Sequence, residues 1–299
     1  MTASAPRVLV SGNCLTAGLA AALLRMGAAS ETHALPLTGE TPDALRAKLD
    51  TLAASTDLWL LSPNNKVGRA AAQAHGKRVQ LLPLIQFGAF QPDICYAWHR
   101  GTRTLTSPHY NSAIVVWGWR NGLDAGATAA LFRAETFAAL GYFDAWAPGL
   151  KDLQRAFADA GLAHRLADWF LAVKREGCFM HSINHPRLDA VVHLARVLAE
   201  EAGLPLRREV QSGEIHDGLN GTIWPVYPEI AERLGIHGGS YAWKYLTQNR
   251  FIDGVEDFVA QAFAGYLRQG LGREDLEITY QDASPIDRAL RRITAMACP

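Results

Sequence analysis

The sequence lacks the features that mark several specialised protein classes. Its four cysteines do not have the close, regular spacings of a zinc site or a disulfide framework, so we expect a reducing, cytoplasmic environment: Cys14, Cys95, Cys178 and Cys298. Neither sign of charge is in excess, since 29 Lys and Arg balance 29 Asp and Glu, which argues against a nucleic-acid binder. No apolar run approaches the roughly 20 residues of a membrane-spanning helix. The apolar run near the N-terminus is not preceded by a basic region and is interrupted at Gly12, so we do not expect it to be a secretory signal.

Apolar residues, in contrast, are plentiful. They make up 49% of the 299 residues, whereas charged residues make up 19%, so the chain can bury at least one large core. In the first third, apolar runs at 7–11, 58–61 and 79–85 alternate with helical patterns at 15–26, 41–54 and 66–74. This alternation predicts a parallel sheet covered by helices on both faces.

The remaining sequence is less regular. An aromatic-rich connection at 87–111 has no clean period, and we expect it to line a ligand site or a contact between subunits of a homo-oligomer. Strands are predicted at 113–117 and 177–181, and Pro186 is predicted to start a helix because its missing N–H is tolerated at the first helical position. Further helices are predicted at 125–140, 150–160, 163–174, 229–234 and 255–267.

Gly12-Asn13-Cys14 is the first candidate site, because it lies where the first strand meets a helix. Ligands of open α/β sheets bind at the carboxyl ends of strands, and a helix N-terminus favours a thiolate. Gly12 permits a sharp turn, and Asn13 tolerates left-handed backbone angles. The alternative is that Cys14 is a small buried packing residue.

His185 is the second candidate, at a similar strand-to-helix switch. An imidazole beside a thiol or a hydroxyl can act as a general base near neutral pH. The alternative is a helix-capping role before Pro186. His181 lies four residues away, but Pro186 prevents the two histidines from sharing a helical face, so no metal site is predicted.

A glycine pair before a helix-like stretch, 237–244, is a third candidate, because such a turn can present backbone N–H groups to a phosphate. Its residues of interest are Gly238, Gly239, Ser240 and Lys244. An ordinary turn is the alternative. Residues 12–18 (GNCLTAG) do not match a dinucleotide fingerprint, since Cys14 replaces the second glycine and Glu31 precedes the second apolar run.

Three blocks carry a family resemblance: Gly12-Asn13-Cys14, residues 87–96 (FGAFQPDICY) and residues 182–186 (SINHP). With these blocks the chain resembles the WcbI family of capsular-polysaccharide biosynthesis proteins, over most of its length. The resemblance implies an acetyltransferase that binds coenzyme A and O-acetylates a capsule sugar, a 6-deoxyheptose in the closest case. No nucleic-acid partner and no integral membrane segment are expected.

The WcbI family is in turn similar to the SGNH hydrolases, whose blocks are Gly-Asp-Ser and Asp-x-x-His. Here Asn13 replaces the Asp, Cys14 the nucleophilic Ser, and Ser182 the Asp that orients the histidine. A backbone group or Asn184 is therefore expected to orient His185. We expect an α/β fold with an SGNH-like or flavodoxin-like parallel-sheet core over 1–205 and a mostly helical C-terminal extension over 206–299, packed as one compact unit.

The resemblance leaves the mechanism open between two routes. In one, His185 deprotonates Cys14, which carries the acetyl group as a thioester. In the other, His185 activates the sugar hydroxyl directly and Cys14 stabilises the oxyanion. Asn64 is either an oxyanion donor, as in SGNH enzymes, or a plain turn residue.

The phosphates and the long arm of coenzyme A need basic groups and a narrow channel. One wall is predicted at the aromatic connection, with His99, Arg100 and Arg103, and another at 238–244. Two rival functions stay open: an esterase with a Cys–His dyad, and a non-catalytic binding protein of polysaccharide assembly.

Overall fold

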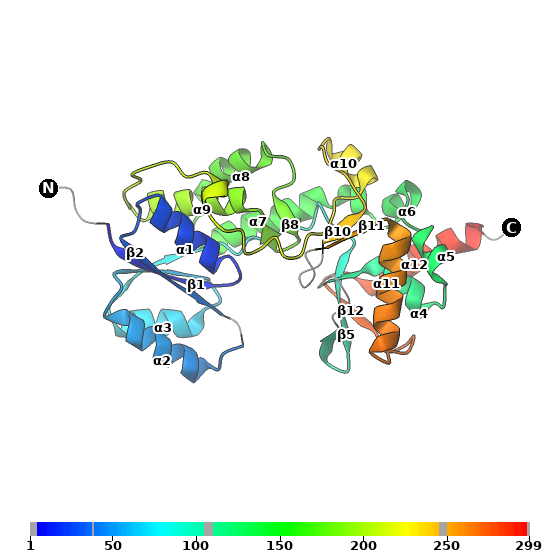
Figure 1. The fold of residues 1–299 in the computed structure, drawn as a ribbon, viewed down its shortest axis with the longest axis horizontal. Coiled ribbons are helices and arrows are strands. Elements are labelled where there is room, and N and C mark those ends of the chain that lie inside the picture. Colours follow the sequence, from blue (N-terminus) through cyan, green and yellow to red (C-terminus); the bar gives the residue numbers. More distant parts are fainter. Residues whose placement is uncertain (1–4, 38, 105–109, 245–249, 298–299) are drawn as a thin grey trace. The chain divides into compact units, whose positions relative to one another are not determined.

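The computed structural model describes residues 5–37, 39–104, 110–244 and 250–297. The chain forms two compact units, each built from separated segments (Figure 1). Unit 1 comprises residues 1–86, 150–180 and 184–219, and unit 2 comprises residues 87–149, 181–183 and 220–299. Of the cysteines, Cys298 lies outside the described residues.

Unit 1 is built around a four-stranded parallel sheet. Its strands are β1 (Arg7–Gly12), β2 (Glu31–Pro36), β3 (Leu58–Leu61) and β4 (Arg78–Leu81). Their order is β2-β1-β3-β4, which matches the first four strands of the flavodoxin-like order. The predicted α/β fold with a parallel sheet is confirmed.

Helices cover both faces of this sheet (Figure 1). On one face, α2 (Pro42–Ala53) and α3 (Lys66–Ala74) pack against Leu9, Trp59 and Leu61. Val8 and Val10 are also buried and, because side chains alternate along a strand, point to the other face, where α1 (Thr16–Arg25) packs with α9 (Leu188–Glu201). Gly18 allows the approach of these two helices, since a Cβ at this position would lie 3.2 Å from Val191 Cγ1.

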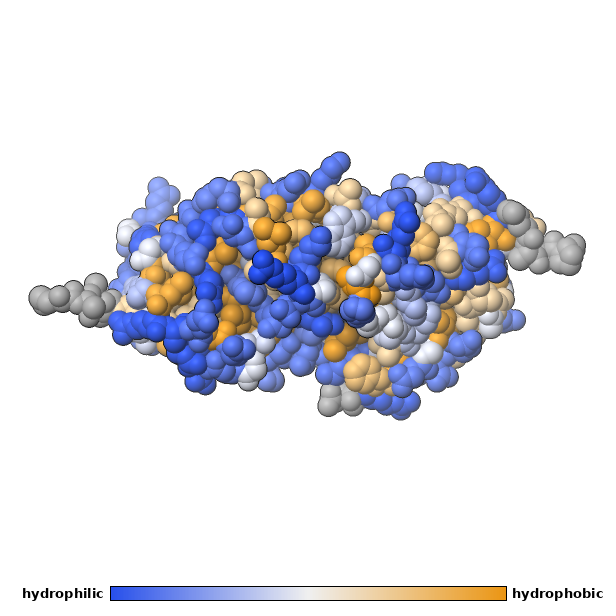
Figure 2. All heavy atoms as spheres, turned by 90° about the horizontal axis from the view of Figure 1, so that it is seen from above, coloured by the Kyte–Doolittle hydropathy of each residue, from blue (hydrophilic) through white to orange (hydrophobic). Residues whose placement is uncertain are grey.

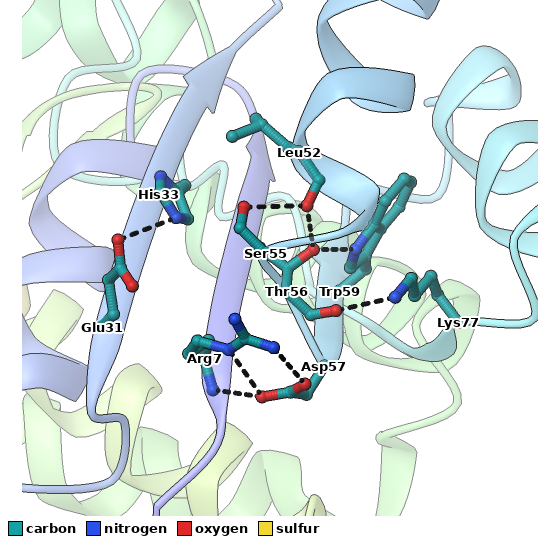
Figure 3. Close-up of polar contacts among 9 residues, drawn as sticks. All are labelled: Arg7, Glu31, His33, Leu52, Ser55, Thr56, Asp57, Trp59 and Lys77. Atoms are coloured by element: carbon teal, nitrogen blue, oxygen red, sulfur yellow. Dashed lines mark hydrogen bonds and ion pairs between the residues drawn. The ribbon is translucent and has the colours of Figure 1, made fainter.

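Polar contacts tie together the amino ends of the strands (Figure 3). Asp57 accepts hydrogen bonds from the backbone N–H of Arg7 (2.9 Å) and from its guanidinium (3.1 Å). Thr56 Oγ1 accepts from the buried Trp59 indole (2.7 Å) and donates to Leu52 O (2.8 Å). These contacts hold the end of the sheet opposite the carboxyl ends of β1 and β3.

Later segments complete unit 1. They contribute η2 (Ala163–Arg165), α8 (Leu166–Lys174), β9 (His185–Pro186) and η3 (Ser212–Glu214). The helix α7 (Trp146–Asp159) spans the segment boundary at 149/150, and β8 (Met180–Ser182) spans that at 180/181. Trp169, on α8, is fully buried and donates its indole N–H to Ala190 O (3.1 Å), which fixes α8 against α9.

Unit 2 combines two small antiparallel sheets with helices. Its strands are β5 (Ile94–His99), β6 (Thr102–Thr104), β7 (Asn111–Ser112), β10 (Ala242–Lys244), β11 (Phe251–Asp253) and β12 (Glu277–Thr279). β12, β5 and β6 pair in that order, β7 pairs with β5, and β10 pairs with β11. Its helices are α4 (Ala113–Arg120), α5 (Ala125–Ala129), α6 (Ala134–Ala139), η1 (Tyr142–Asp144), α10 (Pro228–Leu234), α11 (Val255–Arg268) and α12 (Ala283–Ala297). The predicted helical C-terminal region is thus confirmed.

A buried carboxyl lies at the centre of unit 2. Asp93 is fully buried and accepts hydrogen bonds from Tyr142 OH (2.9 Å), Tyr227 OH (2.8 Å) and the backbone N–H of Ile114 (3.2 Å). Because burial disfavours the ionised form, the pKa of Asp93 is raised to about 6. Asp93 therefore joins three separate segments of unit 2 through one side chain.

Some predicted elements are wrong. The run at 113–117 is helical, as part of α4, because Ser112 caps the helix by accepting from Val115 N (3.1 Å). The helix predicted at 125–140 is divided into α5 and α6, and β4 ends at Leu81 rather than 85. The connection at 87–111 contains the β5–β6 hairpin, whose turn residues Arg100 and Gly101 have positive φ angles of 49° and 75°.

The surface is mixed in character. Figure 2 shows one face on which hydrophilic residues predominate and apolar residues emerge between them. The large apolar side chains exposed among the described residues are Leu24, Val79, Leu171, Leu206, Phe251, Leu267 and Tyr280. None of the helices in the described ranges has both the length and the apolar character needed to cross a bilayer.

Candidate active site

The carboxyl ends of β1 and β3 form one edge of the unit 1 sheet. Gly12 ends β1 and lies beside Ser62, which follows β3: a Cβ on Gly12 would be 3.5 Å from Ser62 Cβ. At the same edge, the buried Asn65 side chain donates from Nδ2 to Ser11 Oγ (3.1 Å) and accepts at Oδ1 from Gly68 N (2.7 Å). Sequence reasoning missed Ser11 and Asn65. The signals that could have found them are a polar residue at the end of an apolar run, for Ser11, and an N-cap position before a helix, for Asn65.

The turn after β1 is made without left-handed residues. Asn13 Oδ1 accepts from Leu15 N (3.2 Å), and Asn13 O accepts from Thr16 Oγ1 (2.6 Å), so the asparagine closes the turn through its own side chain and carbonyl. Neither Gly12 nor Asn13 has a positive φ angle. The tolerance of Asn13 for left-handed angles is therefore not used, and Gly12 continues the pairing of β1 with β2.

The Cys14 thiol lies directly before α1 and reaches the histidine turn. Its Sγ donates to the backbone oxygen of Asn184, at 3.8 Å. The side chain is half-buried, and this burial raises the pKa of the Cys14 thiol, with the backbone N–H groups of Cys14 and Leu15 acting in the opposite direction. The prediction that the helix N-terminus favours the thiolate is thus wrong in its net direction, because desolvation outweighs the local dipoles.

His185 lies in β9, half-buried and one residue after the carbonyl that receives the Cys14 thiol. The helix α9 begins at Leu188 with Arg187 as its N-cap, so Pro186 does not start the helix and His185 does not cap it. Both of those predictions are wrong. The helix start is predicted two residues too early because Pro186 is the last residue of β9 and Arg187 is the N-cap.

The two other residues singled out by the resemblance to SGNH hydrolases, Ser182 and Asn64, each form a side-chain hydrogen bond. Ser182, at the position of the orienting Asp, donates its hydroxyl to Tyr110 OH (2.9 Å) within unit 2. Asn64 is exposed, and its Oδ1 accepts from Ser62 Oγ (2.8 Å). Because this bond engages the oxygen of the amide, its NH₂ group is the part of Asn64 that is left to donate.

The first predicted phosphate-binding set lies on the β5–β6 hairpin of unit 2. Arg100 is exposed at the turn, His99 lies 3.9 Å from Asp275, and Arg103 stacks on the Tyr96 ring at 4.1 Å from its centroid. Of the three, Arg100 projects from the turn, whereas the side chains of His99 and Arg103 lie against other residues of unit 2.

The second set, at 238–244, also lies in unit 2 and is not followed by a helix. Lys244 ends β10, which pairs with β11, so the predicted helix after the glycine pair is wrong. Both positions require glycine for structural reasons. Gly238 has a positive φ of 86°, and a Cβ on Gly239 would lie 2.8 Å from Pro228 Cα. Ser240 N donates to Val226 O (2.9 Å).

The sequence also matches a known family over more than half of its length. Residues 7–207 match the sequence model of the family described as polysaccharide biosynthesis enzyme WcbI. The chain belongs to the WcbI family. It is thus a member of a family of polysaccharide biosynthesis enzymes. No curated protein matches it closely enough in sequence to be counted a relative.

A solved WcbI structure has the same fold. It covers 97% of this chain, which covers 95% of that one, with a TM-score of 0.66 and 13% sequence identity. It is described as a novel polysaccharide biosynthesis enzyme, in its native form without a disulfide bond between coenzyme A and its Cys14.

The match to the WcbI family model covers some of the candidate site residues but not others. It includes the turn of Cys14, the turn of Asn184 and His185, and the hairpin of Arg100, whereas the segment 238–244 lies beyond it. The family assignment therefore rests on unit 1 and the first part of unit 2.

Proposed function

We propose that this protein transfers an acetyl group from acetyl-coenzyme A to a hydroxyl of a capsular polysaccharide sugar of the 6-deoxyheptose type, at a centre formed by Cys14 and His185. The observation that carries the proposal is the 3.8 Å hydrogen bond from Cys14 Sγ to Asn184 O, because it joins the cysteine turn to the histidine turn at the carboxyl edge of a parallel sheet. Membership of a polysaccharide biosynthesis family supports a sugar as acceptor.

The groups at this edge fit a thioester and a sugar hydroxyl. The first turns of α1 and α3 contain no acidic residue, and Lys66 opens α3, so an anionic ligand meets no repelling carboxylate there. The other side chains at the edge are neutral hydrogen-bonding groups: Ser11, Asn13, Ser62, Asn64 and Asn65. The similar WcbI structure is described with reference to coenzyme A and its Cys14, and this chain also has a half-buried cysteine at position 14.

The raised pKa of Cys14 favours direct transfer over an acetyl-cysteine. His185 takes the proton of the sugar hydroxyl as its oxygen bonds to the acetyl carbonyl carbon. The Cys14 S–H turns from Asn184 O to the developing oxyanion, to which the Asn64 amide N–H also donates. His185 then returns its proton to the sulfur of the departing thiolate as the C–S bond breaks. Acetyl-coenzyme A supplies the activated acyl group and leaves as coenzyme A.

Calorimetric titration with coenzyme A tests the first requirement. Reducing conditions prevent a mixed disulfide with Cys14 from imitating reversible binding, and 3′-dephospho-coenzyme A and NADP serve as comparison ligands. We expect selective micromolar binding of coenzyme A. If none of the three binds, a coenzyme A-dependent transferase is ruled out.

Variants then test the centre, with coenzyme A release in the presence of acceptor sugar as the readout. His185→Ala should lower kcat by about 100-fold or more. Cys14→Ser keeps a hydroxyl donor and should stay within about tenfold of the parent. Cys178→Ser is the matched control, since that thiol also donates to a backbone oxygen of unit 1, Met180 O at 3.2 Å.

The same measurements separate the rival functions. Acetylated Cys14 trapped in the parent protein, together with an inactive Cys14→Ser variant, would establish the covalent route instead. Hydrolysis of simple esters without coenzyme A would indicate an esterase. Unchanged function in both Cys14→Ala and His185→Ala variants would indicate a binding protein.

A further inference from the structure

Unit 2 contains an arginine-lined pocket that the proposed function does not use. It has a volume of about 650 Å³ and is formed by residues of α4, the segment 273–278 and α12. Apolar side chains such as Val116, Ile278 and Ile286 form part of its wall. This volume lies within the range of small-molecule sites, roughly 300–1,000 Å³.

The charged groups of this pocket are predominantly cationic. Four arginines line it, Arg120, Arg273, Arg288 and Arg291, together with the two carboxylates of Glu274 and Asp287. The chain as a whole has a formal net charge of zero, so the excess of guanidinium groups is a local feature. A concave site lined by one sign of charge focuses its field on a ligand of the opposite sign.

The Asp287 carboxylate is paired with one of the four guanidinium groups, whereas the other three have no ion-pair partner in the described part of the chain. Asp287 pairs with Arg291 (2.8 Å) and accepts from the Trp117 indole (3.0 Å), which fixes Arg291 in place. Among the residues that the structure describes, Arg120, Arg273 and Arg288 form no ion pair within 4.0 Å. Four guanidinium groups face two carboxylates, so the lining has an excess of positive charge that an anionic ligand would offset.

We infer that this pocket binds a phosphoryl group of a small phosphorylated molecule. Guanidinium groups present planar pairs of N–H donors that match phosphate oxygens, and a phosphate dianion neutralises the excess charge of the lining. A structural role explains part of the cluster, because Arg120 and the Arg273 guanidinium lie near the C-terminal end of α4, where a helix dipole favours cations. It does not account for Arg288, which lies in the first half of α12.

The test measures binding of inorganic phosphate and pyrophosphate by calorimetry and by the shift in Tm, against sodium chloride at equal ionic strength. Arg120→Gln and Arg288→Gln remove exposed guanidinium groups and should each weaken binding by about tenfold or more. Arg292→Gln is the matched control, because Arg292 is an exposed neighbour on α12 that does not line the pocket. Cys14→Ser should bind phosphate as the parent does, so that failure of the acetyl-transfer proposal leaves this result unaffected.

Three further ligands distinguish the source of the phosphoryl group. Tighter binding of uridine diphosphate than of inorganic phosphate indicates a nucleotide, and tighter binding of glucose 1-phosphate indicates a sugar phosphate. Glucuronate tests for a carboxylate instead, and its preference over phosphate would overturn the inference. A response no larger than that to sodium chloride, or an equal loss in Arg292→Gln, would also overturn it.

Discussion

At the scale of single residues, burial decides the chemistry of the two most informative acids. Cys14 lies at the start of α1, where dipoles favour its anion, yet desolvation raises its pKa. Asp93 accepts hydrogen bonds that favour its anion, among them those from Tyr142 and Tyr227, yet its complete burial raises its pKa to about 6. For both side chains, burial outweighs the local donors.

The thiol of Cys14 should therefore react slowly with iodoacetamide at pH 7. We expect the rate of its alkylation, followed by mass spectrometry of the peptide, to rise with pH to a midpoint above the ordinary value of 9.0. Cys298→Ser provides a simpler background, and denatured protein gives the unperturbed reference. A midpoint below that of the denatured protein would show a thiolate stabilised by the turn and would restore the covalent route.

Asp93 should make the stability of unit 2 fall with rising pH. Its folded-state pKa, about 6, exceeds the ordinary 3.8, so its stabilising contribution is complete below about pH 4 and is lost as pH rises through about 6. The change amounts to roughly 3 kcal/mol. Measured as Tm from pH 4 to 8, Asp93→Asn should remove this slope while the exposed Asp282→Asn keeps it. Equal slopes in both variants would contradict the raised pKa.

At the scale of elements, local pattern is enough where it is bounded by turn residues. The fully buried run predicted at 58–61 coincides with β3, and the helix predicted at 66–74, which exposes one face, coincides with α3. The pattern fails at α4, whose residues 113–118 are all buried, because a helix without a polar face cannot be told from a buried strand by period. His185 lies in β9, which is not a strand of the parallel sheet, so the proximity of the Cys14 and His185 turns depends on the packing of later segments. The protonation of Cys14 likewise depends on burial and is not encoded locally.

The loop between α2 and β3 offers a test of one element junction. Thr56→Val keeps the side-chain shape but leaves the buried Trp59 indole N–H without its acceptor, so we expect a loss of about 1–3 kcal/mol in the free energy of unfolding. Ser55→Ala is the matched control, since its hydroxyl donates to the same Leu52 oxygen but is half-buried (Figure 3). Equal urea midpoints for the two variants would show that the indole bond contributes nothing.

At the scale of the whole molecule, both units are assembled from segments far apart in the sequence. Unit 2 takes residues 87–149 from the middle of the chain and residues 220–299 from its end. No stretch rich in Pro, Gly or Ser marks these crossings, which is why sequence composition does not reveal them. The two parts of unit 2 are joined in its interior, where Tyr227 donates to Asp93 (2.8 Å) and β12 pairs with β5.

Removal of residues 220–299 should therefore unfold unit 2 and leave unit 1 intact. The shortened chain keeps every segment of unit 1, whereas in unit 2 it deprives the buried Asp93 of Tyr227 and exposes the edge of β5. Hydrogen exchange is the appropriate measurement, because it reports each strand separately. Amides of Leu9 and Leu60 should stay protected as in the full chain, while those of Ile94 and Ala97 should exchange freely. Protection of all four would mean that residues 87–149 hold their fold alone, and loss of all four would mean that unit 1 depends on unit 2 for its stability.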